Sequence, residues 1–184
     1  MITQLLTGLR LSVASMAICV GLYAALVWGF AQIAVPFTAN GAILTNADGQ
    51  IVGSRQIAQG FTRPEYLWPR PSAVDYNAAA AGGSNWSPTS SMVHDRGAAM
   101  VALYGATSEN PLPADLATAS GAGLDPHISE AGALYQAARV AGARGVPVER
   151  IEALIRDHAT SPGSFLTGDR IVNVLELNLA LDQM

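Results

Sequence analysis

Lysine is absent from this sequence of 184 residues, and all ten cationic side chains are arginine. With fourteen acidic side chains they give a formal net charge of -4, which argues against nucleic-acid binding through a basic surface. The missing lysine also excludes a phosphate-binding loop of the Walker type. Cys19 is the single cysteine, so no disulfide framework exists. Its apolar surroundings predict a small buried hydrophobic side chain.

Charge is also missing from one long stretch, because no Asp, Glu, Lys or Arg occurs between Arg10 and Asp48. As a helix, Leu11–Val35 is about 37 Å long, enough to cross the roughly 30 Å of hydrocarbon in a bilayer. We predict an α+β protein with a transmembrane helix at residues 11–35, preceded by a short cytoplasmic N-terminus at residues 1–10. One soluble mixed α/β domain follows outside the cytoplasm, at residues 36–184.

The alternative for the apolar stretch is a cleaved secretory signal peptide. Such a peptide has an apolar region of about 7–15 residues and ends in a small-x-small cleavage site. For cleavage after Ala39, the −3 position, which should hold a small residue, would be occupied by Phe37. This favours a retained anchor. Arg10 precedes the span, whereas Asp48 is the first charge beyond it, so the positive-inside rule places the N-terminus in the cytoplasm. A single-pass protein of the cell inner membrane with a periplasmic main domain is therefore expected.

Small residues recur at every fourth position within the predicted span. They are Ala17, Gly21, Ala25 and Gly29, here named the small-residue face. Small side chains let another helix backbone approach closely in lipid. We therefore expect this face to pack on a partner membrane subunit.

Turn and cap signals divide the rest of the chain. We predict a hairpin-like turn around residues 42–46 and then a strand at residues 50–54, followed by an ordered irregular segment at residues 60–88 that is rich in Pro and aromatic residues. Helices are expected at residues 91–104, from the Ser129 cap to Arg144, and after Pro147. Asn173 and Glu176 have the form of a capping box before a terminal helix, although alternating leucines equally permit a strand there.

Motifs of catalysis are scarce. Ser120, Asp125 and His127 contain the residue types of a hydrolase triad, but triads are defined by their placement in space. His94 and His127 lack the spacing of metal ligands, so no metal site is expected. The small residues at 118–125 suit either a tight turn or a backbone that approaches an anion.

Four segments resemble the KdpC family, the C subunits of the Kdp potassium-transporting ATPase. As in that family, they follow a membrane anchor. They are Trp68–Ser72, Gly82–Asn85, Thr118–Ser129 and Val172–Asp182. The chain departs from the usual family pattern at Trp86 and Ala122.

The resemblance implies an accessory subunit without chemistry or a cofactor of its own. It implies assembly with the channel-like KdpA subunit, the ATP-hydrolysing KdpB subunit and the small KdpF peptide. It also implies a chaperone role that raises the ATP affinity of the pump subunit, with ATP held jointly. The candidate nucleotide ligands in this chain are Ser120, Gly121, Gly123 and Gln136. Because an outer domain does not meet cytoplasmic ATP, an indirect effect through a preferred pump conformation is the alternative.

Other classes of function remain open from the residues alone. A membrane-tethered extracytoplasmic hydrolase would use Ser120 and His127. A stand-alone sensor domain would leave ATP-driven potassium uptake unchanged when the chain is deleted.

Overall fold

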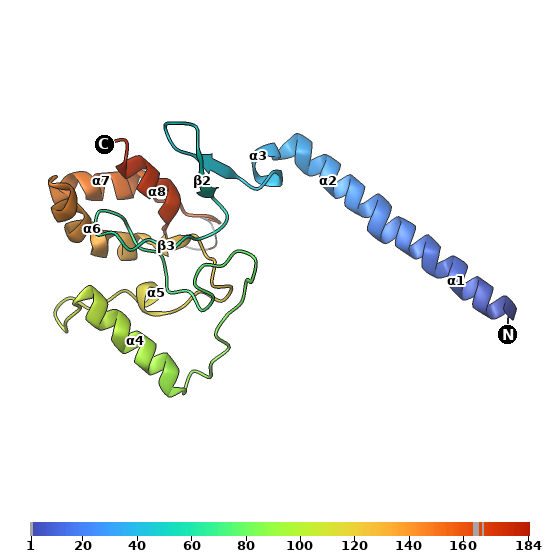
Figure 1. The fold of residues 1–184 in the computed structure, drawn as a ribbon, viewed down its shortest axis with the longest axis horizontal. Coiled ribbons are helices and arrows are strands. Elements are labelled where there is room, and N and C mark those ends of the chain that lie inside the picture. The colour runs from blue at the N-terminus through green and yellow to red at the C-terminus, as the bar shows by residue number, and fades with distance from the viewer. Residues whose placement is uncertain (1, 164–165, 167) are drawn as a thin grey trace. The chain divides into compact units, whose positions relative to one another are not determined.

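A computed structural model describes residues 2–163, 166 and 168–184 (Figure 1). The chain divides into two compact units, Met1–Ile43 and Leu44–Met184. The first is dominated by one apolar helix, and the second mixes helices with two small sheets. This confirms an α+β protein with one N-terminal helix that is long and apolar enough to cross a membrane.

The apolar helix runs without a break from Ile2 to Ala34, and its most apolar window has no residue buried by the chain. It consists of α1 (Ile2–Met16), a π-helical segment (Ala17–Leu22) and α2 (Tyr23–Ala34). The helix therefore starts well before the predicted span. It ends at Val35, which has φ −143°, because Pro36 disfavours helical geometry in the residue before it. The predicted burial of Cys19 is wrong within this chain, since its thiol is exposed.

A short helix and a hairpin follow the membrane helix. The helix is α3 (Pro36–Ala39), and the hairpin pairs β1 (Ile43–Thr45) with β2 (Ile51–Ser54). The predicted strand at residues 50–54 is confirmed, whereas the turn predicted around residues 42–46 is misplaced, because residues 43–45 form β1 and the turn follows at residues 46–50. Asn46 Oδ1 accepts the N–H groups of Asp48 and Gln50 at 3.1 and 2.9 Å, which closes the hairpin loop. The next helix starts only at Ser91, so the predicted irregular segment is confirmed.

The remaining elements are α4 (Ser91–Tyr104), α5 (Ala114–Ala117), β3 (His127–Ser129), α6 (Glu130–Arg144), α7 (Val148–His158), β4 (Ile171–Asn173) and α8 (Val174–Leu181). The cap signals for α6 are confirmed. Ser129 Oγ accepts the Gly132 N–H at 2.8 Å, and Gly145 ends the helix at φ +67°. The terminal segment is a helix, because Asn173 Oδ1 accepts the Glu176 N–H at 3.1 Å. The Glu176 carboxylate pairs with Arg55 at 3.1 Å.

Strands β3 and β4 form an antiparallel pair in which Ile128 lies opposite Val172. The helices α6, α7 and α8 gather around this pair and form the core with Leu67 of the irregular segment (Figure 1). The pair places the loop before β3 beside the start of α8, since the Val174 N–H donates to the Pro126 carbonyl at 2.9 Å.

Candidate functional site

Ser120, the first candidate nucleotide ligand, lies buried in the loop between α5 and β3, with 4% of its surface exposed. Its N–H donates to the Pro71 carbonyl at 3.1 Å, and its hydroxyl accepts the Asp125 N–H at 3.4 Å. His127 Nδ1 lies 3.4 Å from the Asp125 carboxylate, and no described contact joins His127 to Ser120. This arrangement argues against a hydrolase triad, in which the base must contact the nucleophile.

The two candidate glycines have different surroundings. Gly123 has φ +69°, and an added Cβ would lie 2.6 Å from Val74 Cγ2 and 2.9 Å from the Gly82 carbonyl oxygen. Ser72 Oγ donates to the Gly123 carbonyl at 2.7 Å. Gly121 is exposed, and an added Cβ there would have no atom within 4 Å. Gly123 is therefore required by close contact between two loops, whereas position 121 has room for a side chain.

Gln136, the fourth candidate, lies on α6 with 1% of its surface exposed. Its Oε1 accepts the Trp68 N–H at 2.8 Å and a guanidinium N–H of Arg139 at 2.6 Å. Its Nε2 donates to the carbonyls of Trp68 (3.1 Å) and Gly132 (3.3 Å). The structure brings Gln136 to the irregular segment and shows no described contact between it and Ser120. Both polar atoms of its amide already have partners within the chain.

Sequence reasoning missed that side chains from α6 and α8 hold the backbone of residues 64–68. Asn178 accepts the Leu67 N–H at 2.8 Å and donates to the Leu67 carbonyl at 3.0 Å. Arg139 donates to the carbonyls of residues 64 and 66, and Arg144 Nε donates to that of residue 65. These side chains supply hydrogen bonds that a neighbouring strand would otherwise give. The only signal in the sequence is that Gln136 and Asn178 interrupt otherwise apolar helix faces.

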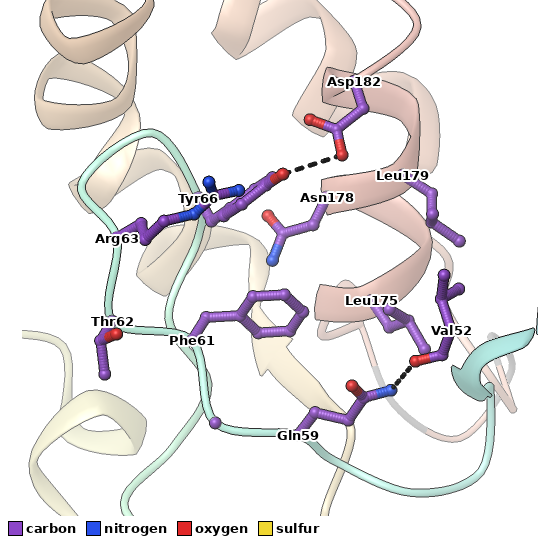
Figure 2. Close-up of a pocket in the computed structure, with 11 residues that line it drawn as sticks. Val52, Gln59, Phe61, Thr62, Arg63, Tyr66, Leu175, Asn178, Leu179 and Asp182 are labelled. Atoms are coloured by element: carbon purple, nitrogen blue, oxygen red, sulfur yellow. Dashed lines mark hydrogen bonds between the residues drawn. The ribbon is translucent and has the colours of Figure 1, made fainter. Parts of the chain in front are cut away.

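A cleft of about 410 Å³ lies between the irregular segment and α8 (Figure 2). Phe61, Leu175 and Leu179 contribute apolar surface, and Tyr66 and Asp182 contribute polar groups. The Tyr66 hydroxyl donates to Asp182 at 2.9 Å, as the dashed line shows. Burial, together with Asp182, raises the pKa of Tyr66 above its ordinary value, so the phenol stays neutral. The cleft thus combines apolar walls with one basic and one acidic side chain, Arg63 and Asp182.

A second, more polar cleft of about 530 Å³ lies beside β3. Asp125 accepts from Arg70 Nη1 and from the His127 N–H, both at 3.0 Å. Hydrogen bonding from His127, with a smaller contribution from Arg70, lowers the pKa of Asp125. Asp115 accepts the N–H and hydroxyl of Ser129 at 2.7 and 3.0 Å. In the part of the chain that the structure describes, no three His, Cys, Asp or Glu side chains are grouped to hold a metal.

On the membrane helix, Ala17, Gly21 and Ala25 of the small-residue face are exposed, and Gly29 is partly exposed. An added Cβ at Gly21 or Gly29 would meet no atom within 4 Å. The π-helical segment covers Ala17–Leu22 and thus changes the angular offset between the first two members of the face, which the sequence pattern does not reveal. The face is open for another helix, and its packing role stays a prediction.

Comparison with known proteins agrees with this architecture. The chain matches the family described as "KdpC: K+-transporting ATPase, c chain" over residues 5–183. A potassium-transporting ATPase KdpC subunit of Parvibaculum lavamentivorans is 63% identical over 179 residues, covering 97% of this chain and 96% of the relative. Its counterpart in Ralstonia nicotianae is 46% identical, covering 89% of this chain and 82% of the relative. The chain therefore belongs to the KdpC family and is a subunit of the K+-transporting ATPase complex, with one candidate transmembrane helix at its N-terminus.

Proposed function

We propose that this chain is a non-catalytic accessory subunit that holds the channel-like KdpA, the ATP-hydrolysing KdpB and the small KdpF peptide together. The observation that carries the proposal is the helix Ile2–Ala34, whose most apolar window buries no residue within its own chain. Such a helix gains its stability from lipid and from other membrane helices. The small-residue face offers the close approach that a second helix needs.

The orientation follows from the charge distribution. With Arg10 before the span and Asp48 beyond it, the N-terminus lies in the cytoplasm and the main domain in the periplasm. The protein is then a single-pass component of the cell inner membrane.

We propose that the chain, as a chaperone, changes the ATP affinity of the pump indirectly. A subunit that binds one conformation of the pump better than another shifts the ATP affinity of that pump without contacting nucleotide. The burial of Ser120 and the four hydrogen bonds of the Gln136 amide support this indirect form over direct ATP ligation by these side chains. The exposed Gly121 remains the candidate best placed for a direct backbone contact.

The test consists of three measurements, protease digestion in sealed membrane vesicles and two assays of ATP binding to the pump. Protease added to sealed, right-side-out vesicles is expected to digest the main domain, and the Km of the pump for ATP is expected to rise when the chain is deleted. Photolabelling with an azido-ATP is expected to mark KdpB and to leave this chain unlabelled. Protection of the domain would contradict the orientation, and an unchanged Km would contradict the chaperone role.

A further inference from the structure

Helix α4 is the least covered helix of the second unit. None of its residues is buried, and Met92, Val101 and Leu103 are 49%, 43% and 56% exposed. It packs along α5, and Tyr104 at its C-terminal end meets Tyr135 of α6 with ring centroids 6.2 Å apart (Figure 1). A helix of this length in water depends on tertiary packing of its apolar side chains for stability. Its apolar outer surface therefore lacks the cover that other helices of the unit have.

A groove of about 250 Å³ runs between the C-terminal half of α4 and the irregular segment. Its walls include Trp68, Tyr76, Met100, Leu103 and Tyr104. The rings of Trp68 and Tyr104 meet edge to face with centroids 5.6 Å apart. Burial raises the pKa of Tyr104 well above its ordinary value, so its hydroxyl stays a neutral hydrogen-bond donor. The groove is aromatic and apolar, and is suited to an inserted apolar side chain.

One carboxylate stands at this groove, on a strained turn. Asp75 and Tyr76 have φ +51° and +57°, a conformation that costs free energy for residues other than glycine. Ser72 Oγ holds the turn by accepting the N–H groups of Val74 (3.2 Å) and Tyr76 (3.0 Å). Among the described residues that line the groove, Asp75 is the one that carries charge. The turn thus adds negative charge to an apolar groove.

We propose that this groove, named here the α4 groove, docks a loop of another subunit of the potassium-transporting ATPase that presents an apolar side chain beside a Lys or Arg. The charge of Asp75 complements the cation, and the aromatic walls with Leu103 receive the apolar group. This inference rests on the proposed accessory function.

A lipid surface fits the same helix less well. Helices that lie on membranes carry Lys and Arg on their polar face. The one Arg of α4, Arg96, instead turns toward the loop before the helix, with its guanidinium 4.8 Å from the Trp86 ring and Nη1 3.4 Å from Ser84 Oγ. Anionic headgroups would also be repelled by Asp75.

The test uses the full chain assembled in its complex in native membranes. A photo-crosslinking amino acid, benzoylphenylalanine, replaces Leu103, and the same residue replaces the 72% exposed Ile51 as a matched control. The expected result is a crosslink from position 103 to a polypeptide of another subunit, and much less from position 51. In the position-103 background, Asp75→Asn should lower the crosslink yield about threefold. Asn is chosen because it tolerates positive φ as Asp does.

Failure of this inference is distinguishable from failure of the proposed function. If the chain co-purifies with the other subunits but position 103 crosslinks only to lipid, to a second copy of the chain or to nothing, the α4 groove is not the docking site. If the chain does not co-purify at all, the accessory function itself fails, and the inference with it. An unchanged yield in the Asp75→Asn variant would overturn the part assigned to charge.

Discussion

The side-chain amide of Gln136 pairs with the backbone of Trp68 in both directions, accepting its N–H at 2.8 Å and donating to its carbonyl at 3.1 Å. The guanidinium of Arg139 lies 3.8 Å from the centroid of the Trp68 ring. One turn of α6 therefore fixes both the backbone and the ring of a residue in the irregular segment. Since Trp68 also lines the α4 groove, the shape of that groove depends on α6.

Gln136→Met keeps the size of the side chain but leaves the Trp68 backbone groups without their partner. We expect a loss of about 2–3 kcal/mol in the free energy of unfolding, because unpaired backbone groups away from water are costly. Thermal unfolding of the detergent-solubilised chain, followed by intrinsic fluorescence, measures the effect. The exposed Gln183→Met is the control, expected to change stability by less than about 0.5 kcal/mol. Equal stability of the two variants would show that the amide pairing contributes nothing.

Gly123→Ala and Gly121→Ala form a second matched pair. At position 123 the methyl group meets Val74 and the Gly82 carbonyl and requires φ +69°, so a loss of about 2–4 kcal/mol is expected. At position 121 the methyl group has open space, and a change within about 0.5 kcal/mol is expected. The same unfolding measurement compares them. A neutral Gly123→Ala would mean that the two loops are not in close contact.

Acid should destabilise the second unit through Asp125. Because His127 and Arg70 lower the pKa of this carboxyl in the folded protein, its ionised form contributes stability above the unfolded pKa of about 3.9. That contribution is lost as pH falls through the lower folded pKa. The midpoint of thermal unfolding, measured from pH 7 to pH 3, should fall less steeply in Asp125→Asn than in the wild type. The exposed Asp157→Asn serves as control and should keep the wild-type slope. Identical slopes for all three proteins would refute the assignment.

Replacing Gly21 and Ala25 by Leu should weaken assembly without unfolding the chain. Both residues are exposed within the chain, and bulky side chains there would keep a second helix backbone away. We expect at least about a fivefold loss of co-purifying subunits, a difference of roughly 1 kcal/mol. The exposed Val20→Leu and Leu26→Ile variants change other helix positions and are expected to co-purify normally. Assembly that survives the double substitution would rule out the small-residue face as a packing surface.

Local signals in the sequence predicted most helices well. Ser129 and Gly145 mark the ends of α6 because a side-chain cap and a left-handed glycine act within a few residues of themselves. The pairing of Glu152 with Arg156 at 2.8 Å likewise depends only on helix spacing.

Strands β3 and β4 were not predictable in the same way. Each has three residues, too few for a periodic pattern, and the pairing joins Ile128 to Val172 across a long stretch of chain. The capping box is confirmed for Asn173, whose side chain accepts the Glu176 N–H. The Glu176 side chain instead pairs with Arg55, which is distant in sequence, so local spacing does not predict this contact. At the candidate site, the hydrogen bonds of Ser120 and Gln136 with the irregular segment also depend on such distant contacts.

We expect the apolar helix to stay in the membrane and to anchor the chain in the potassium-transporting ATPase complex. Affinity purification through a C-terminal tag, from carbonate-washed membranes, tests it most directly, with intact mass measured on the purified chain. We expect an uncleaved chain that co-purifies with the other subunits of the ATPase in fixed proportion. A chain recovered from the soluble fraction, shortened near Ala39 and without other subunits, would contradict it.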